Sequence, residues 1–180
     1  VVMSSTSERY HPLSIALHWL MAFLLIGLCV MGWMLADLPF SPRKLQWYSW
    51  HKWAGVTAFL LVIVRLLWRW QHTPPPLDAR MDPLTMRLAH WGHAGLYVLM
   101  IVIPLSGWLM SSAKGFQTVW FGVLPLPDVI APNEIYATVL TQLHVTFTTL
   151  LALLVAAHVA AALKHHWLDR DQTLRRMRPW

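Results

Sequence analysis

Ten histidines stand out in this chain of 180 residues, because 57% of its residues are hydrophobic and only 12% are charged. An ionisable side chain inside an apolar segment is costly and marks either a functional site or a paired interior position. Imidazole is also the commonest side-chain ligand for metals. The spacing of the histidines therefore matters, since it decides which of them can share a site.

His144 and His158 predict two stacked sites on one helix. They lie 14 residues apart, which is close to four helical turns, so both side chains lie on one face. The rise between them is about 21 Å, and an apolar membrane slab is about 30 Å thick. One imidazole therefore lies near each edge of the slab, which suits two metal centres better than a single one.

Each of these two histidines needs a partner at its own depth on another helix. His51 is the only other histidine on the side of His144, so this pair is forced if a two-histidine site exists there. His158 has three possible partners, which are His18, His90 and His93. We favour His18 because it lies at comparable depth within an apolar run.

The predicted donor set favours haem over zinc or copper. Each site offers two facing imidazoles with no cysteine or carboxylate nearby, whereas zinc prefers four tetrahedral ligands. Two imidazoles on opposite sides of an iron leave the equatorial positions to a porphyrin, and alanines between 152 and 162 leave room for flat rings in the bundle core. We expect two haem b groups per chain. Iron with both axial positions filled by protein suits electron transfer better than oxygen binding.

Arg65 is a candidate partner for a haem propionate. It lies 14 residues after His51, hence on the same helical face and near the depth of His158. A guanidinium there could form a charge-assisted hydrogen bond with a carboxylate. The alternative is that Arg65 extends to the membrane surface.

Four apolar segments must position these side chains. A transmembrane helix needs about 20 mostly apolar residues, so the predicted fold class is all-α, an integral membrane four-helix bundle in a single domain over 1–180. Proline-containing connections are expected between the segments, at 37–49, 72–87 and 113–139, and the longest could carry a short interfacial helix. The predicted spans are about 13–35, 50–70, 88–111 and 140–163.

The basic residues predict the orientation of the chain in the membrane. Of the 14 Lys and Arg residues, ten fall on the side of the two termini, and such an excess marks the cytoplasmic side. Because the basic residues flank apolar segments instead of forming one polar face, they do not indicate nucleic-acid binding. Cys29 is the single cysteine, so no intramolecular disulfide can form. The other four basic residues, on the side opposite the termini, are Arg43, Lys44, Lys52 and Lys114.

Several short motifs follow one another in a fairly specific order. They are Ile15-Ala16-Leu17-His18-Trp19-Leu20, His51, Val64-Arg65-Leu66-Leu67, Leu88-Ala89-His90-Trp91-Gly92-His93, the pair His144 and His158, His165-His166, and Asp171-Gln172-Thr173-Leu174-Arg175-Arg176-Met177. In this order the sequence resembles the bacterial cytochrome b561 family of four-helix, di-haem cytochromes of the inner membrane. The resemblance covers nearly the whole chain. It implies that His18 with His158, and His51 with His144, bind the iron of haem b, and that a quinone such as ubiquinone is the redox partner.

The resemblance leaves two functions open. Some relatives oxidise superoxide in the periplasm and reduce ubiquinone, which favours an oxidoreductase. Others resemble cytochrome subunits that pass electrons from a periplasmic hydrogenase or dehydrogenase to quinone. A third possibility from another class, a histidine-rich metal transporter or sensor without haem, is disfavoured because the predicted spans contain no acidic ligands.

Two sets of histidines could take part in quinone binding or proton transfer at the cytoplasmic end. His90 and His93 are three residues apart and share a helical face, so they could line a quinone pocket or relay protons. The alternative is that they only cap their helix among the lipid headgroups. His165 and His166 are weaker candidates for the same role.

Basic residues near His51 could attract an anion. Lys52, Arg43 and Lys44 make this mouth of the predicted bundle positive, and a positive mouth raises the local concentration of a small anion such as superoxide. Ordinary interfacial lysine and arginine are the alternative explanation.

Overall fold

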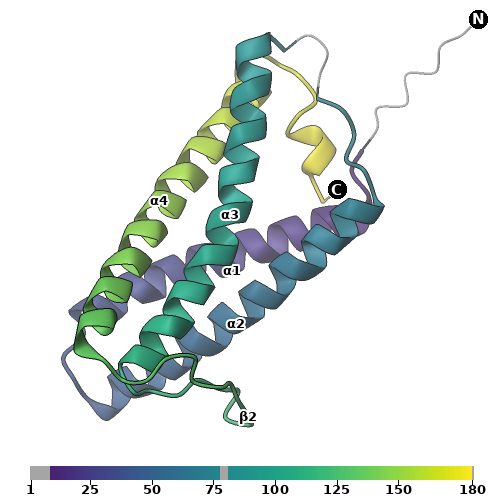
Figure 1. The fold of residues 1–180 in the computed structure, drawn as a ribbon. Coiled ribbons are helices and arrows are strands. Elements are labelled where there is room, and N and C mark those ends of the chain that lie inside the picture. Colours follow the sequence, from purple (N-terminus) through teal and green to yellow (C-terminus); the bar gives the residue numbers. More distant parts are fainter. Residues whose placement is uncertain (1–8, 78–80, 180) are drawn as a thin grey trace, which may run out of the picture.

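Four long helices dominate the computed structural model, which describes residues 9–77 and 81–179 (Figure 1). Each helix is long and apolar enough to cross a membrane. The predicted all-α membrane bundle is therefore confirmed. The helices are α1 (Pro12–Asp37), α2 (Pro42–Gln71), α3 (Pro83–Ala113) and α4 (Glu134–Trp167).

The helices begin earlier than hydropathy predicts, because capping residues start them within polar sequence. Ser41 and Asn133 cap α2 and α4, and each side chain accepts a hydrogen bond from the amide three residues later, at 3.2 and 3.0 Å. Pro42 follows as the first residue of α2, where its missing N–H costs nothing. The predicted connection 37–49 is therefore wrong over most of its length, since only 38–41 join α1 to α2.

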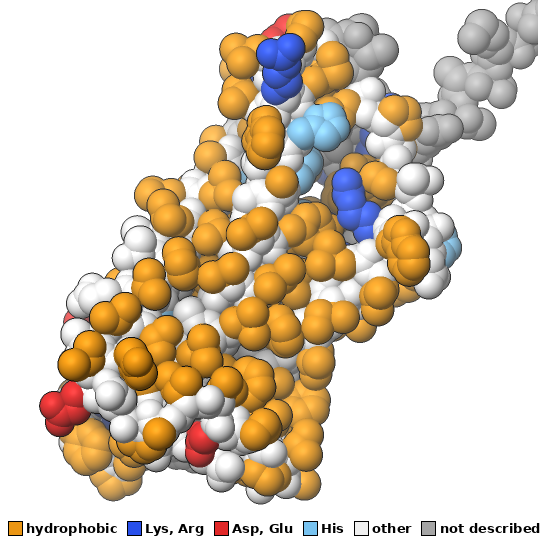
Figure 2. Space-filling view, in the orientation of Figure 1, with side chains coloured by type: hydrophobic (Ala, Val, Ile, Leu, Met, Phe, Trp, Pro, Cys, Tyr) orange, Lys and Arg blue, Asp and Glu red, His pale blue; other side chains and the backbone are white. Residues whose placement is uncertain are grey.

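The helices form two closely packed pairs. α1 packs along α2, α3 packs along α4, and contacts between α2 and α3 join the pairs, whereas α1 and α4 approach each other only locally. Few side chains are fully buried, and Val62 on α2 is one of them. Hydrophobic side chains cover the middle of the face in Figure 2, as expected of helices that face lipid.

The connection between α3 and α4, which could have carried a short interfacial helix, holds a small β-hairpin instead. Strand β1 (Val119–Trp120) pairs antiparallel with β2 (Leu124–Pro125). The turn between them contains Phe121 and Gly122 in the left-handed region, with φ of 50° and 71°. Two consecutive residues with positive φ match the twist of a two-stranded ribbon.

The chain turns back after α4 and covers the end of the bundle that carries both ends of the described chain. A 3₁₀ turn, η1 (Arg175–Met177), lies in this returning segment. The indole nitrogen of Trp19 on α1 donates to the carbonyl of Met177 at 2.8 Å, and the guanidinium of Arg176 donates to the carbonyl of Pro76 at 2.7 Å. We call this the terminal end of the bundle. Arg80, one of the basic residues counted for orientation, lies outside the described residues.

Candidate metal centres

The structure brings His18 and His158 together near the terminal end. Their ring centroids are 6.2 Å apart, although α1 and α4 have few other contacts. Metal–imidazole bonds of about 2 Å place two coordinating nitrogens about 4 Å apart, with each ring centre one ring radius further out. The observed separation therefore suits one metal ion held between two facing imidazoles.

A third histidine, His93 of α3, also reaches this site. Its ring centroid lies 5.5 Å from that of His158. Both His18 and His93 are thus close enough to share a site with His158, so distance alone does not choose between them.

Arg65 points into the bundle instead of extending to the surface. One terminal nitrogen of its guanidinium lies 3.3 Å from Nδ1 of His18, and Nε donates to the hydroxyl of Tyr97 at 3.0 Å. Its guanidinium forms no ion pair with any carboxylate of the described residues. This half-buried cation beside His18 is placed where it could bind an anionic group of a cofactor.

His51 and His144 form the pair at the opposite end of the bundle. They lie on α2 and α4 within electrostatic range of each other. Nδ1 of His51 is buried and has no hydrogen-bond partner among the residues that the structure describes. Because a buried nitrogen without a partner costs free energy, such an atom points to a site whose full set of ligands includes a further group.

The orientation of His144 is fixed by α3. Its Nδ1 donates to the carbonyl of Ile103 at 3.1 Å and lies 3.0 Å from the hydroxyl of the buried Ser106. This bond holds the tautomer whose Nε2 is free to bind a metal. Gly107 lets the ring approach the helix, since a Cβ there would lie only 3.0 Å from Cε1 of His144. This support could not be predicted from the sequence, because two small residues in an apolar helix have many other uses.

The donor set at both pairs fits haem. Within the described part of the chain, neither pair belongs to a cluster of three or more metal-binding side chains. Two imidazoles alone leave a bare ion with too few ligands, whereas a porphyrin supplies four nitrogens of its own. His51 with His144, and His158 with His18 or His93, are therefore the residues that would hold such a group.

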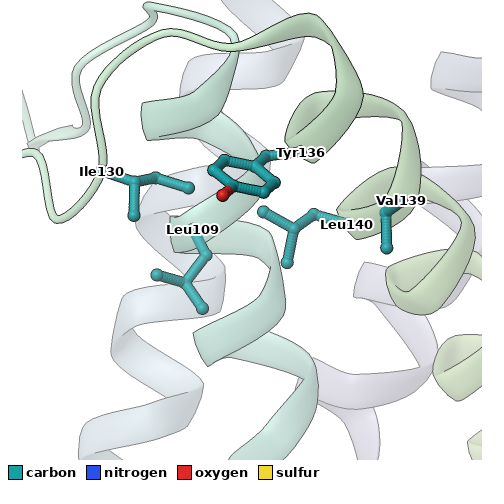
Figure 3. A pocket seen from close by; sticks show the side chains of 5 residues that line it. All are labelled: Leu109, Ile130, Tyr136, Val139 and Leu140. Carbon is teal, nitrogen blue, oxygen red and sulfur yellow. The ribbon is translucent and has the colours of Figure 1, made fainter.

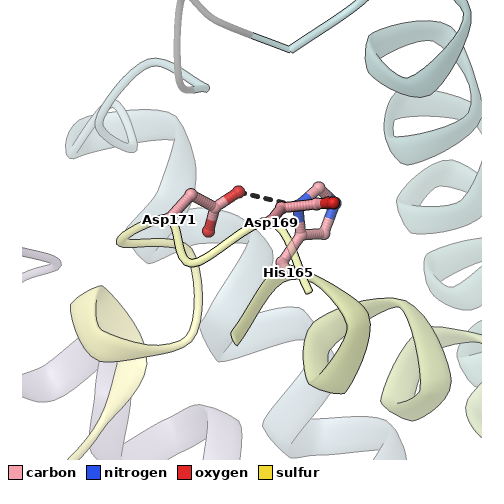
Figure 4. A group of neighbouring side chains, drawn as sticks. All are labelled: His165, Asp169 and Asp171. Atoms are coloured by element: carbon pink, nitrogen blue, oxygen red, sulfur yellow. Dashed lines mark hydrogen bonds and ion pairs between the residues drawn. The ribbon is translucent and has the colours of Figure 1, made fainter. Parts of the chain in front are cut away.

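A separate cluster fixes the returning segment at the terminal end (Figure 4). Nδ1 of His165 lies 2.7 Å from a carboxylate oxygen of Asp171 and 3.1 Å from one of Asp169, whose carboxylate also pairs with the ammonium of Lys164 at 2.6 Å. Burial raises the pKa of the Asp171 carboxyl, but hydrogen bonds from Thr173 and His165 outweigh this and hold the pKa below its ordinary value. The cluster thus ties the end of α4 to the chain that follows it.

The four histidines predicted to line a quinone pocket or relay protons have different surroundings in the structure. His90 is exposed and donates from Nδ1 to the carbonyl of Met86 one turn earlier on the same helix, at 2.7 Å, whereas His93 points inward. His165 is buried against Asp171, whereas the ring of its neighbour His166 lies 6.3 Å from that of Trp167. Of these four, only His93 approaches a histidine pair.

Neutral groups surround the basic residues near His51. The ammonium of Lys52 donates to the hydroxyl of Ser111 and to the carbonyls of Gln117 and Phe116, at 3.2, 3.2 and 3.4 Å. Lys44 donates to a carbonyl, and Arg43 lies over the ring of Trp47 at 5.8 Å. None of the three forms an ion pair with a described carboxylate, although Asp128 lies within electrostatic range of Lys52. A net positive charge therefore remains at this mouth to attract a diffusing anion.

An apolar groove lies at the same end, between α3 and α4 (Figure 3). It has a volume of about 280 Å³, and the hydroxyl of Tyr136 is the only polar side-chain group in its lining. A hydrocarbon chain suits this groove better than the polar ring of a quinone does. The lining residues are Leu109, Ile130, Tyr136, Val139 and Leu140.

Four membrane-crossing helices with histidine pairs at both ends define a class of membrane protein that holds metal centres inside a helical bundle. The model of the prokaryotic cytochrome b561 family matches residues 9–180, and the chain belongs to that family. It is therefore a multi-pass electron-transfer protein of the inner membrane that carries haem b.

Three proteins of known sequence are similar to nearly the whole chain. Cytochrome b561 homolog 2 of Escherichia coli (strain K12) is 33% identical, over 97% of this chain and 93% of that protein. The probable superoxide oxidase CybB of Yersinia pestis is 30% identical, over 96% and 97%. Cytochrome b561 homolog 1 of Escherichia coli (strain K12) is 29% identical, over 96% and 98%.

Proposed function

We propose that this chain binds two haem b groups and carries electrons between the periplasm and the quinone pool. The observation that carries the proposal is the approach of His18 to His158, at 6.2 Å between ring centroids, on two helices that otherwise have few contacts. The second histidine of α4, His144, lies about 21 Å from His158 along the helix and within electrostatic range of His51. Haem iron supplies one-electron chemistry at each pair.

The surrounding residues have separate roles in this proposal. Arg65 binds a propionate of the haem next to His18, because it is a half-buried cation with only neutral partners. Ile103 and Ser106 hold His144 with Nε2 toward the interior. His93 and His165 are the histidines that could deliver protons, since the first lies beside His158 and the second is held by Asp171.

The basic residues support an orientation with both termini in the cytoplasm. Lys and Arg are in excess at the terminal end of the bundle, which is the rule for cytoplasmic surfaces. In this orientation the His51 and His144 pair lies at the periplasmic surface, with Lys52 beside it.

Superoxide is the electron donor that we propose. Two superoxide ions lose one electron each and become two molecules of oxygen, while one quinone takes up the two electrons and two protons and becomes quinol. The positive charge of Lys52, Arg43 and Lys44, none of which is ion-paired with a described carboxylate, favours an anionic donor. The similarity to the probable superoxide oxidase of Yersinia pestis supports the same donor.

A stopped-flow pulse of superoxide onto the oxidised, purified protein tests this donor. We expect the haem absorbance to change to that of the reduced form during the stopped-flow trace. Superoxide dismutase in the same buffer should abolish this change. Catalase in both samples excludes hydrogen peroxide as the reductant. Absence of haem reduction would overturn superoxide as the donor and favour a cytochrome subunit that serves a periplasmic dehydrogenase or hydrogenase.

A further inference from the structure

The connection between α3 and α4 contains an uncharged, apolar stretch at residues 115–127. Lys114 immediately precedes it and Asp128 immediately follows it, but no charged residue lies within it. Four of its large apolar side chains are exposed, and Val123 at the hairpin is 83% accessible. A contiguous exposed apolar surface of this kind marks a binding face. The other exposed apolar side chains of this stretch are Phe116, Phe121 and Leu124.

Two tryptophans fix the hairpin against α2. The indole nitrogen of Trp53 donates to the carbonyl of Val119 at 2.6 Å, and that of Trp120 lies 3.3 Å from both the carbonyl of Trp53 and the hydroxyl of Thr57. The ring of Phe121 packs 5.5 Å from that of Trp53. The polar groups of this contact are therefore satisfied inside the protein, as a lipid environment requires.

The depth of Trp53 places the hairpin at the level of the membrane. The exposed Arg69 lies 16 residues later on α2, toward the terminal end, which corresponds to about 24 Å along the helix axis. The hydrocarbon core is about 30 Å thick. With Arg69 at one boundary of the core, Trp53 lies roughly 6 Å inside the other boundary.

The hairpin lies to the side of the bundle, next to α2 (Figure 1). Helix α2 itself continues for 11 residues from Trp53 back to Pro42, which is about 16 Å further from the terminal end. The hairpin tip is thus set back from the outermost part of α2.

We propose that the hairpin of β1 and β2 is a membrane anchor that inserts Phe121, Val123 and Leu124 into the nearer leaflet, at the boundary between lipid headgroups and acyl chains. The partner is phospholipid, because the stretch has no charged side chain of its own and Trp53, which holds the hairpin, lies near the boundary of the hydrocarbon core. Aromatic and aliphatic side chains at this depth are typical of interfacial anchors. The anchor holds the loop beside α2, close to the His51 pair.

Depth-dependent quenching tests this proposal in the whole protein. A Cys29→Ser background receives Val123→Cys, an environment-sensitive fluorophore is attached, and the haem-loaded protein is placed in lipid nanodiscs. The lipids carry a nitroxide either near the headgroup or near the end of the acyl chain. We expect the label to lose most emission to the shallow nitroxide, less to the deep nitroxide, and least to aqueous iodide.

Phe40→Cys provides the matched control. Phe40 is 80% exposed and apolar, but it lies in the connection before α2 begins. Its label should be quenched by iodide more than by either lipid. The proposal is overturned if iodide quenches both positions equally, since the hairpin then lies in water. It is also overturned if no quencher reaches position 123, since a second copy or another protein then covers it.

Discussion

Replacing His144 with leucine tests whether the two histidine pairs act as separate sites. His144 and His158 share α4 but lie 14 residues apart, about 21 Å along the axis. Substitutions this far apart, with no shared partners, have independent effects. We therefore expect the His144→Leu variant to lose about half of its haem, while the site at His18 and His158 keeps its group. His18→Leu should give the reciprocal result.

The assay is haem content per chain, from the pyridine haemochrome of purified protein, combined with a redox titration of the α band. Each single variant should titrate as one component, whereas the parent protein should show two. Loss of both groups from His144→Leu would refute the independence of the sites and show that they form as one unit.

His93→Leu is the matched control for the choice of ligand. The His93 ring is closer to His158 than the His18 ring is, at 5.5 against 6.2 Å, but we assign it no iron. The variant should therefore keep both haem groups. If His93→Leu loses a haem and His18→Leu does not, the ligand on that side is His93.

Three further outcomes follow from single contacts. Gly107→Val should displace the ring of His144 and shift the potential or occupancy of that haem alone in a redox titration; Gly27→Ala, with no atom within 4 Å of the added Cβ, should change nothing. Asp171→Asn should lower the unfolding free energy by about 1–3 kcal/mol at neutral pH. Because the pKa of Asp171 is held below its ordinary value, this stabilisation is lost as the pH falls through the folded-state pKa, so the melting temperatures of parent and variant should converge in acid. A difference that persists there would contradict the assignment. Lys52→Gln should slow haem reduction by superoxide roughly a few-fold at low salt and less at high salt, measured by stopped flow; an equal effect at both would argue against attraction.

The existence of the four helices could be predicted from sequence, because a bilayer selects apolar stretches of a fixed length. Their ends could not be predicted from hydropathy. Ser41 and Pro42 start α2 within polar sequence, through a capping bond and a suitable proline conformation. The hairpin was missed because its strands have two residues each and depend on Trp53, more than 60 residues away in the sequence.

One of the two histidine pairs could be predicted from the sequence, whereas the partner of His158 could not be chosen. Helical periodicity places His144 and His158 on one face of α4, and depth limits the partner of His144 to His51. Depth does not separate His18 from His93, and the structure brings both to His158. The pairing of His165 with Asp171 depends on a reversal of the chain after α4, for which the sequence showed no signal.

An absorption spectrum with haem quantitation tests the proposed pairing of four histidines most directly. Protein purified from haem-replete cells should show a Soret band, and dithionite should sharpen the α band of low-spin haem b. The haemochrome should give about two groups per chain. One group per chain, or a colourless preparation, would contradict the proposal that imidazoles at both ends of the bundle hold haem iron.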